Sequence, residues 1–292
     1  MTDLTAITGL TGMETITSAA NQRVKQAAAL RDADARRSTG LTIVDGRREL
    51  SRAAAAGVEI VEVFVTAEAI AAAAPIADEA STLAEWLTRL VDRGTRAALV
   101  SERAFERVAF GGRNEGVVGV VRFGPWPLTE RVFAADRPVL VIEGVEKPGN
   151  LGAIIRTADA AGLGGVLVCD GRTDLANPAA IRASLGTVFS LPLACAAIDE
   201  VIDWCRRHDR HVVAATPKGR RLWHEAELRG GATILLGSEA HGISPAWEAA
   251  AAGGRLAFDT VRLPMHGVAD SLNLSVTAAV LAYEAVRQRE AH

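Results

Sequence analysis

From Val139 onward, short apolar segments alternate with segments of helical periodicity, and this alternation constrains the fold more than any other feature. The segment Val139-Leu140-Val141-Ile142 is apolar at every position, as in a parallel strand that helices cover on both faces. Similar short runs follow at residues 166–169, 212–215 and 233–236, with helical segments between them. The pattern predicts an α/β fold with a mostly parallel sheet over residues 139–292.

Residues 1–123 alternate in the same way and are predicted to form a smaller α/β domain. The segment Gly124-Pro125-Trp126-Pro127 contains one glycine and two prolines, and a charged stretch follows it to Arg137-Pro138, so we expect a linker at 124–138. A long surface loop inside one domain is the alternative. Helices are expected at 19–37, 47–56, most of 67–91 and 272–290, and strands at 41–44, 60–65, 96–100 and 116–123.

The composition is that of a globular protein, with 49% apolar and 23% charged residues, and it excludes a disordered, collagen-like or disulfide-stapled chain. The net charge of −3 gives no basic excess that would by itself indicate nucleic acid. Cys169, Cys195 and Cys205 have no CxxC spacing, so we expect reduced thiols. No apolar run could span a bilayer, and the first residues lack the pattern of a signal peptide. We therefore expect a cytoplasmic protein without a membrane partner.

Three loops, residues 143–150, 237–244 and 263–275, are rich in small and polar residues, and each lies between an expected strand and an expected helix. Ligands of open parallel sheets collect at such junctions, because backbone amides and helix N-termini point there. The sequence therefore predicts a site where these loops meet.

The first loop leads into a helix in which Asn150 is the expected N-cap. Arg156 lies beside the apolar stripe of this helix, and an unpaired buried guanidinium is very costly. Its partner is either Asp159, three residues further on, or a phosphate or reacting hydroxyl of a substrate. The residues of this loop leave both interpretations open.

In the second loop, Gly237 and Gly242 permit a ligand to approach the backbone closely, whereas Glu239 is either a site carboxylate or a partner of a helix dipole. In the third loop, Asp270 or Ser271 could cap the last helix. The chain has no GxGxxG or GxxxxGK[ST] phosphate loop, no GxSxG nucleophile turn and no cluster of metal ligands, so we expect no metal.

Taken together, the three loops resemble one family. Asn-Leu-Gly-Ala-Ile-Ile-Arg-Thr-Ala (150–158), Leu-Gly-Ser-Glu-x-x-Gly-Ile-Ser (236–244) and Leu-Pro-Met-x-Gly-x-x-x-Ser-Leu-Asn-Leu-Ser-Val (263–276) are similar, in this order, to motifs of the SpoU/TrmH RNA 2′-O-methyltransferases of the SPOUT superfamily. The resemblance extends from about residue 139 to residue 289, and residues 177–186 are similar to a fourth family segment. Residues 1–123 look like the ribosomal-protein-like RNA-binding domain of many members, with Val-Asp-Gly-Arg-Arg-Glu-Leu (44–50) in the place where the family often has a Gly-x-x-x-Glu pattern.

This resemblance implies a SPOUT α/β domain whose C-terminal segment forms a deep trefoil knot, a feature that general topology rules would not predict. It also implies S-adenosylmethionine as the cofactor, RNA as the substrate, and a homodimer with each active site near the subunit interface. Ribosomal RNA is favoured, because the shorter members that act on transfer RNA tend to lack the N-terminal domain. The alternatives are a tRNA 2′-O-methyltransferase and a catalytically silent RNA-binding knot protein. A nucleotide-dependent oxidoreductase is disfavoured by the missing glycine fingerprint.

By motif position, the resemblance assigns three sets of residues. The implied reaction site consists of Asn150, Arg156, Glu239, Ser271 and Asn273. The implied cofactor contacts are Thr216, Gly237, Gly242, Leu263, Met265 and Leu272. The RNA-binding candidates are Arg36, Arg37, Arg47, Arg48 and Arg113, for which solvated helix faces are the alternative. Ala240 departs from the family, in which glycine is common at this position.

We interpret Arg156 as a group that grips a phosphate and stabilises the developing alkoxide of the ribose. A literal base is disfavoured, because the guanidinium group, with a pKa above about 12, is rarely deprotonated in proteins.

Overall fold

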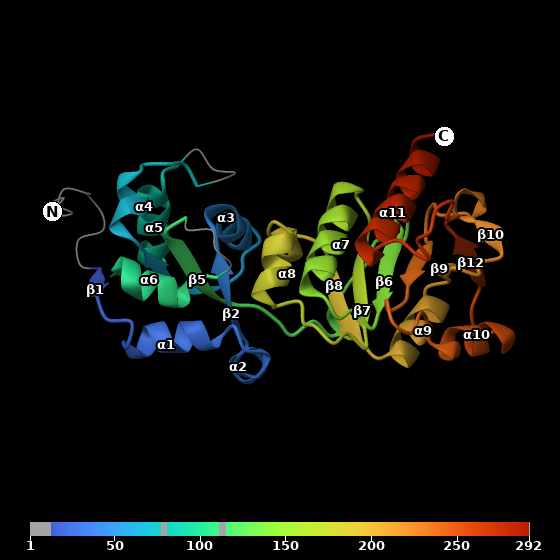
Figure 1. Ribbon diagram of the computed structural model, residues 1–292, viewed down its shortest axis with the longest axis horizontal. Coiled ribbons are helices and arrows are strands. Elements are labelled where there is room, and N and C mark those ends of the chain that lie inside the picture. The colour runs from blue at the N-terminus through green and yellow to red at the C-terminus, as the bar shows by residue number, and fades with distance from the viewer. Residues whose placement is uncertain (1–12, 77–80, 111–114, 292) are drawn as a thin grey trace. The chain divides into compact units, whose positions relative to one another are not determined.

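The computed structural model describes residues 13–76, 81–110 and 115–291 (Figure 1). The chain divides into an N-terminal unit, Met1–Pro125 with Ala176–Ser190, and a C-terminal unit, Trp126–Leu175 with Leu191–His292. Most of the expected linker, from residue 126 to residue 138, thus belongs to the C-terminal unit. In the described part of the chain, no helix is long and apolar enough to cross a membrane.

The N-terminal unit is built on a five-stranded sheet in the order β1-β4-β3-β5-β2. Strands β1, β4 and β3 pair in parallel, whereas β5 runs antiparallel to both β3 and β2. The strands are β1 (Glu14–Ile16), β2 (Leu41–Asp45), β3 (Ile60–Val65), β4 (Arg96–Val100) and β5 (Val117–Arg122). The helices are α1 (Gln22–Ala29), α2 (Ala33–Thr39), α3 (Arg47–Ala55), α4 (Ala67–Ala71), α5 (Leu83–Asp92), α6 (Glu102–Val108), α8 (Pro178–Ala183) and the short η3 (Thr187–Phe189).

Two helices of this unit were expected to be longer than they are. The segment 19–37 divides into α1 and α2, because the Asp32 side chain accepts the Asp34 N–H at 2.8 Å and begins a new helix. The segment 67–91 divides into α4 and α5, where Thr82 and Glu85 form a capping box. The expectation of one helix at 19–37 was therefore wrong, whereas 67–91 was expected to be helical only for the most part. Strand β1 and helix α6 were not predicted.

The C-terminal unit is built on a seven-stranded sheet in the order β10-β12-β9-β11-β6-β7-β8, whose neighbouring strands pair in parallel. This confirms the α/β fold with a mostly parallel sheet. The strands are β6 (Val139–Glu143), β7 (Gly165–Cys169), β8 (Leu193–Ala196), β9 (Val212–Ala215), β10 (Arg221–Leu222), β11 (Thr233–Leu236) and β12 (Phe258–Arg262). The helices are α7 (Pro148–Ala160), α9 (Ile198–Arg207), α10 (Pro245–Ala252), α11 (Leu274–Glu290) and the short η2 (Leu128–Glu130) and η4 (Trp223–Glu225).

Helices cover both faces of this sheet, which explains why its central strands are apolar throughout. Helices α9 and α10 lie on one side, and α7 and α11 lie on the other (Figure 1). On the first side, Trp247 of α10 is fully buried, and its Nε1 donates to the Glu143 carboxylate at 2.9 Å. Glu143 also accepts the Ser244 N–H at 3.0 Å, so the end of β6 is fixed to the start of α10.

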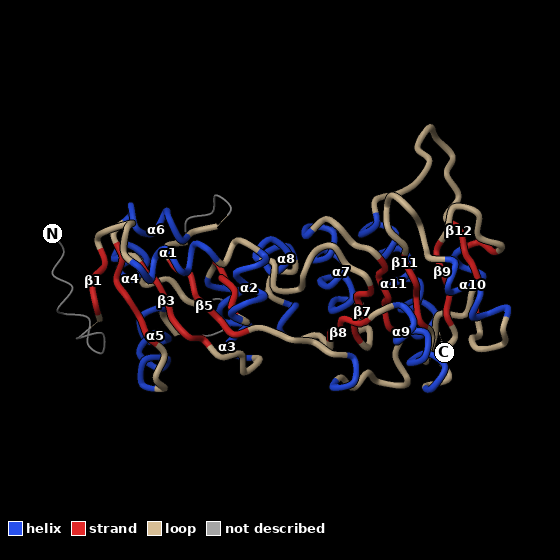
Figure 2. The backbone as a smooth tube through the Cα atoms, turned by 90° about the horizontal axis from the view of Figure 1, so that it is seen from below, coloured by secondary structure: helices blue, strands red, loops and turns tan. Residues whose placement is uncertain are grey.

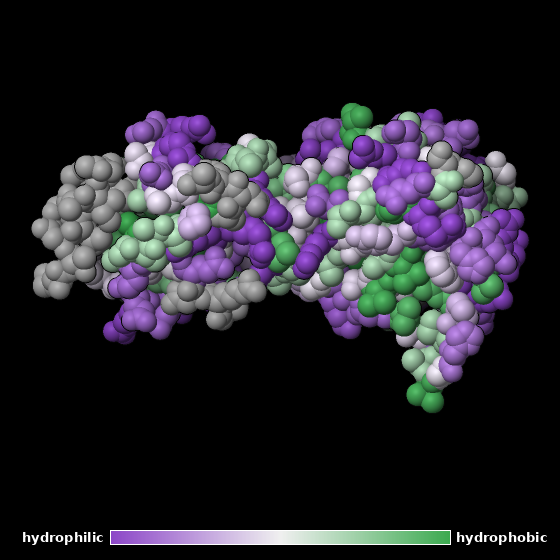
Figure 3. Space-filling view, turned by 90° about the horizontal axis from the view of Figure 1, so that it is seen from above, coloured by the Kyte–Doolittle hydropathy of each residue, from purple (hydrophilic) through white to green (hydrophobic). Residues whose placement is uncertain are grey.

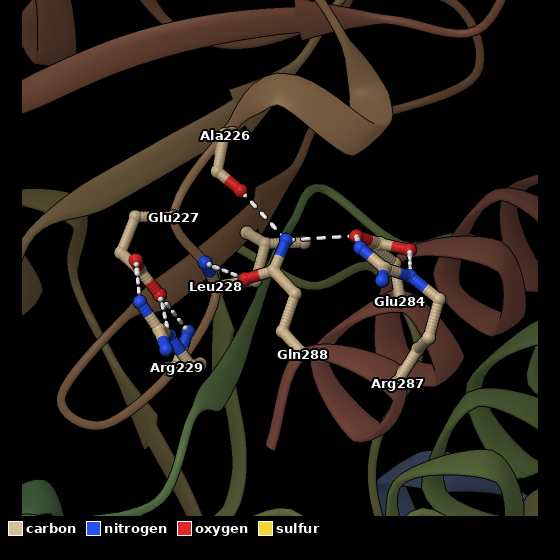
Figure 4. Close-up of polar contacts among 7 residues, drawn as sticks. All are labelled: Ala226, Glu227, Leu228, Arg229, Glu284, Arg287 and Gln288. Carbon is tan, nitrogen blue, oxygen red and sulfur yellow. Dashed lines mark hydrogen bonds and ion pairs between the residues drawn. The ribbon is translucent and has the colours of Figure 1, made fainter. Parts of the chain in front are cut away.

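On the other side, the C-terminal end of α11 is fastened to the segment 226–229 (Figure 4). The Gln288 amide donates to the Ala226 carbonyl at 2.9 Å and accepts the Leu228 N–H at 2.9 Å. It also donates to the buried Glu284 carboxylate at 2.8 Å. Arg287 bonds the same carboxylate and is the main reason why the pKa of Glu284 is lowered. The end of α11 that is remote from the loops is thereby fixed.

Replacement of Gln288 tests this attachment. Gln288→Leu leaves the Leu228 N–H and the Ala226 carbonyl, both on buried residues, without their partner. Each such group is expected to lower the free energy of unfolding by about 1–3 kcal/mol. Urea unfolding measures the loss, with Glu290→Ala on the exposed end of the same helix as the control. Equal stability of the two variants would contradict the attachment.

In the N-terminal unit, Asp45 at the end of β2 is buried. Its Oδ2 accepts the Phe110 N–H at 2.6 Å, while Oδ1 has no hydrogen-bond partner. Burial is the main reason why the pKa of this carboxyl is raised to about 6. The folded chain therefore favours the protonated form, and stability falls as the pH rises from about 4 to about 6.

Asp45→Asn keeps an acceptor for Phe110 and cannot ionise. At pH 7 it is expected to raise the free energy of unfolding by at most about 3 kcal/mol, and near pH 4 by nothing. Urea unfolding of both proteins between pH 4 and pH 8 measures this difference. A difference that is independent of pH would show that the Asp45 charge is not its cause.

Candidate active site

The loops that follow β6, β11 and β12 begin at the same edge of the C-terminal sheet, because these strands are parallel. Three predicted side chains from these loops meet there. Asn150 Nδ2 donates to Glu239 Oε1 at 2.6 Å, and Asn273 Nδ2 donates to Asn150 Oδ1 at 3.2 Å. Residues that are far apart in the sequence are thus joined by hydrogen bonds into one polar cluster.

Lys147, which was not predicted, also belongs to this cluster. Its ammonium group lies 2.9 Å from Glu239 Oε2. The Lys147 hydrogen bond is the largest cause that lowers the pKa of Glu239, and the same bond raises the pKa of Lys147. Glu239 is therefore ionised at neutral pH and acts as an acceptor. The signal in the sequence was a cation directly before the helix N-terminus, where the helix dipole disfavours it.

Helices α7 and α11 begin at other residues than expected, and these starting points determine which side chains can join the polar cluster. Helix α7 begins at Pro148 with Lys147 as its N-cap, so Asn150 lies in the first turn, and the prediction of Asn150 as N-cap was wrong. Helix α11 begins at Leu274, and its N-cap is Asn273 rather than Asp270 or Ser271. Because Asn150 does not cap α7, its amide can bond with Glu239.

The amide orientation of Asn273 follows from its own contacts. Its Oδ1 accepts the Ser275 N–H at 2.9 Å and the Ser275 hydroxyl at 2.7 Å. The Nδ2 group is therefore the one that faces Asn150. The helix cap and the cluster thus use opposite ends of one side chain.

Asn273→Ala is expected to lower the free energy of unfolding by about 1 kcal/mol, because α11 loses its N-cap. Asn273→Ser keeps a capping oxygen on a side chain too short to reach Asn150, so most of that free energy should be retained. Urea unfolding compares the two variants. If serine were as destabilising as alanine, the free energy would come from the contact with Asn150 and not from the cap.

Gly237 and Gly242 form the turn that carries Glu239. Ser238 and Gly242 exchange two backbone hydrogen bonds of 2.9 and 3.0 Å. A Cβ atom on Gly237 would overlap the carbonyl of Gly242, so the chain tolerates no side chain there. Gly242 has a φ of +70°, which also favours glycine. The glycines are therefore necessary for the backbone path of this loop.

Two further strand ends lie beside this turn. The Thr216 N–H, directly after β9, donates to the Val261 carbonyl of β12 at 2.9 Å, and Leu263 follows β12. Gly219 was not predicted, yet a Cβ atom on it would overlap the backbone of Val261. Thr216, Gly237 and Leu263 thus follow adjacent strands of the sheet.

Met265, Ser271 and Leu272 lie in the segment between β12 and α11. This segment projects from the C-terminal unit as a long loop (Figure 2), and the fully exposed Val268 lies in it. No hydrogen bond among the described residues connects Ser271 with the polar cluster. The structure therefore brings together Asn150, Glu239 and Asn273, but it does not bring Ser271 to them.

Arg156 is exposed on α7, about 9 Å along the helix axis from Asn150 and about 120° around it. Within the described residues its guanidinium forms neither the expected ion pair with Asp159 nor a bond with Glu239 or Asn150. The ion pair was thus an incorrect alternative. Within a single chain, Arg156 remains available to a group from outside.

The predicted pair Arg36 and Arg37 separates in the structure. Arg36 is buried, and its guanidinium donates to the carbonyls of Leu30 and Arg31 at 3.0 and 2.8 Å. Arg37 is exposed and forms an ion pair with Asp34. The expectation that both belong to an RNA-facing surface is wrong for Arg36, which holds the end of α1 in place.

Arg47 is likewise occupied, because its guanidinium donates to the carbonyls of Ala69 and Ala74 at 3.1 and 3.2 Å. The expectation of a free surface cation at position 47 was thus incorrect. Arg48 is partly exposed and pairs with the buried Glu49 at 3.1 Å. The remaining candidate, Arg113, lies outside the described residues. Among the described residues, no group of three His, Cys, Asp or Glu side chains could hold a metal ion.

Comparison with known proteins identifies similar chains over both units. The model of the SpoU rRNA Methylase family matches residues 137–283, and that of the MRM3-like substrate binding domain matches residues 21–119. The chain is 27% identical to the 23S rRNA (guanosine(2553)-2′-O)-methyltransferase RlmP of Bacillus subtilis (strain 168), over 93% of this chain and 98% of that protein.

Solved structures are similar over nearly the whole chain. The crystal structure of an RNA 2′-O ribose methyltransferase has a TM-score of 0.77 and 37% identity, covering 94% of this chain and 99% of that one. The SpoU methyltransferase AviRb from Streptomyces viridochromogenes, in complex with AdoMet, has a TM-score of 0.76 and 27% identity, covering 92% of this chain and 98% of that one.

Proposed function

The chain belongs to the SpoU rRNA methylase family, and from this premise we propose that it transfers a methyl group from S-adenosylmethionine to a ribose 2′-hydroxyl of ribosomal RNA. The observation that carries the proposal is the hydrogen-bonded cluster of Asn150, Glu239 and Asn273 beside the Gly237 turn. The names of the relatives and the match of residues 21–119 to a substrate-binding domain support ribosomal RNA as the substrate.

The residues at the sheet edge fit the proposed cofactor. Gly219 and Gly237 leave no room for a side chain, so backbone groups line the ends of β9 and β11. Backbone N–H and carbonyl groups can form hydrogen bonds with the adenine and with the amino-acid part of S-adenosylmethionine. The residues proposed to hold the cofactor are Thr216, Gly237, Gly242, Leu263, Met265 and Leu272. When bound, S-adenosylmethionine supplies an electrophilic sulfonium methyl group.

The polar cluster is proposed to orient the ribose. Glu239 is an ionised acceptor, and the amides of Asn150 and Asn273 have fixed directions, so a hydroxyl bound among them takes one orientation. Ser271, two residues before the cap Asn273, is proposed to complete this site. Orientation of reacting groups contributes roughly 7–11 kcal/mol in favourable cases. No metal is needed for this role.

We propose that Arg156 reaches the cluster from a second copy of the chain. Val276 and Tyr283 are exposed on α11, and Leu272 is exposed two residues before this helix begins. Helix α11 packs against α7, which carries Arg156. An apolar patch lies on this unit in Figure 3. A symmetric dimer that buries this face would place each Arg156 near the partner's site. There the guanidinium would grip a phosphate and stabilise the developing alkoxide.

The family's trefoil knot belongs to the same proposal. It is supported by the path of the chain, which passes from β11 to β12 on the far side of β9 and then returns to α11 beside α7. The free thiols of Cys169, Cys195 and Cys205 support action in the reducing cytoplasm.

A methyl-transfer assay tests the function. The chain is incubated with tritiated S-adenosylmethionine and ribosomal RNA from cells that lack the protein, and the 2′-O-methyl positions are then mapped. We expect transfer to ribose. RNA binding without transfer would instead identify a catalytically silent binding protein.

Arg156→Ala is expected to lower kcat by about 10²–10³, and Arg156→Lys should not restore it, because lysine lacks the planar fork. Near-normal turnover of Arg156→Lys would refute the proposed phosphate contact.

Mixing two inactive variants tests whether the Arg156 of each site comes from the partner subunit. When the inactive variants Arg156→Ala and Asn150→Ala are refolded together, each mixed dimer regains one intact site, or about a quarter of the activity overall. No recovery would place Arg156 and Asn150 of one chain in the same site.

A further inference from the structure

A pair of exposed cations follows β9 in the segment Thr216-Pro217-Lys218-Gly219-Arg220. Both Lys218 and Arg220 are exposed, and within the described residues neither side chain takes part in an ion pair or hydrogen bond. Many other arginines of the chain are occupied by carboxylates or carbonyls, as the ion pair between Arg221 and Asp259 at 3.1 Å illustrates. The two free cations are therefore available to a ligand.

The backbone that carries these cations is held in place. Gly219 is buried against Val261, and its N–H donates to the Thr216 carbonyl at 3.1 Å. The Arg220 N–H donates to the Thr260 hydroxyl at 3.1 Å. Arg262 donates to the carbonyls of Gly219 and Arg220 at 2.7 and 3.2 Å. Because the backbone is already fixed, only the side chains of Lys218 and Arg220 lose conformational freedom when a ligand binds.

The local charge is positive although the net charge of the chain is −3. Of the carboxylates close to this loop in the sequence or on the adjacent strand, Asp259 forms an ion pair with Arg221, and Glu225 accepts the Leu222 N–H at 2.8 Å. Neither carboxylate forms an ion pair with Lys218 or Arg220. An anion at this loop would meet two cations that have no ion-pair partner among the described residues.

The loop lies at the same edge of the sheet as the polar cluster. Strand β9 is the neighbour of β11, which leads to Glu239, and β6 is the next strand. Neighbouring strands are about 4.8 Å apart, so the ends of β9 and β6 are separated by about 10 Å. A nucleic acid strand carries a phosphate about every 3.4 Å of helix rise. Phosphates a few nucleotides from a ribose at the cluster therefore lie within reach of the loop.

We propose that Lys218 and Arg220 form a binding site for RNA backbone phosphates on the C-terminal unit, beside the nucleotide that is methylated. This inference rests on the proposed function and adds a contact that fixes the position of the RNA strand. Such contacts carry no base specificity and act through charge. The site holds the strand next to the reacting ribose independently of the N-terminal unit.

The test compares two double variants that remove the same charge. Lys218→Ala with Arg220→Ala removes the proposed site. Arg206→Ala with Arg207→Ala is the matched control, because these residues end α9 and precede the amino end of β9, at the opposite edge of the sheet. Binding to 23S ribosomal RNA is measured by filter retention over a range of salt concentrations, and binding of S-adenosylmethionine is measured by calorimetry.

For the Lys218 and Arg220 variant we expect a Kd for RNA raised about tenfold, and a salt dependence of log K shallower by about 1.4–1.8. The KM for RNA should rise while kcat and the Kd for S-adenosylmethionine stay unchanged. The exchange Lys218→Arg with Arg220→Lys keeps both charges and should restore RNA binding.

Three results would overturn the inference: unchanged RNA binding, an equal loss in the control variant, or a loss of S-adenosylmethionine binding, which would assign the loop to the cofactor. Binding is measured without turnover. Wild-type protein that binds RNA through these charges but transfers no methyl group would therefore overturn the proposed function and leave this inference standing.

Discussion

The carboxylate of Glu239 is the interaction on which the arrangement of the site depends. It forms an ion pair with Lys147 and accepts a hydrogen bond from Asn150 at the start of α7, and the backbone N–H of Leu274 at the start of α11 adds to the lowering of its pKa. Each helix N-terminus carries a partial positive charge, and Lys147 adds a full one. Without this carboxylate, three positive groups would face one another at the edge of the sheet. One acidic side chain therefore holds two helix starts and one cation in a common position.

This arrangement requires that α11 is fixed at both ends. Near its start, Asn273 caps the helix and bonds with Asn150. Near its other end, Gln288 bonds with the segment 226–229, and Arg289 donates to the carbonyls of Ala161 and Gly162 at the end of α7. Because α7 and α11 are tied together at both ends, neither can slide without breaking polar contacts. The packing of α7 against α11 therefore fixes the geometry of the polar cluster.

The sequence predicted the parallel sheet and the three loops, since a strand buried on both faces needs a continuous apolar run such as Val139 to Ile142. The helix starts could not be predicted, because the partner of Asn150 is Glu239, which is distant in the sequence. Arg36 shows the same limit. Arg36 donates to the carbonyls of Leu30 and Arg31, which lie where the chain breaks between α1 and α2. The sequence pattern predicted one continuous helix there, and in such a helix these carbonyls would be bonded within the helix.

A chain with a net charge of −3 that is proposed to bind RNA cannot rely on its overall field to attract a polyanion. Arg36 and Arg47 bind backbone carbonyls, and Arg287 binds a buried carboxylate, so these cations stabilise the fold. Attraction to phosphates then falls to cations that have no protein partner in the described part of the chain, among them Arg156 on α7 and Lys218 and Arg220 after β9. The contribution of these cations to RNA binding depends on their position more than on their number. Cations at the edge of the sheet that holds the polar cluster act where a ribose must be oriented, and the rest of the surface can remain acidic without loss of function.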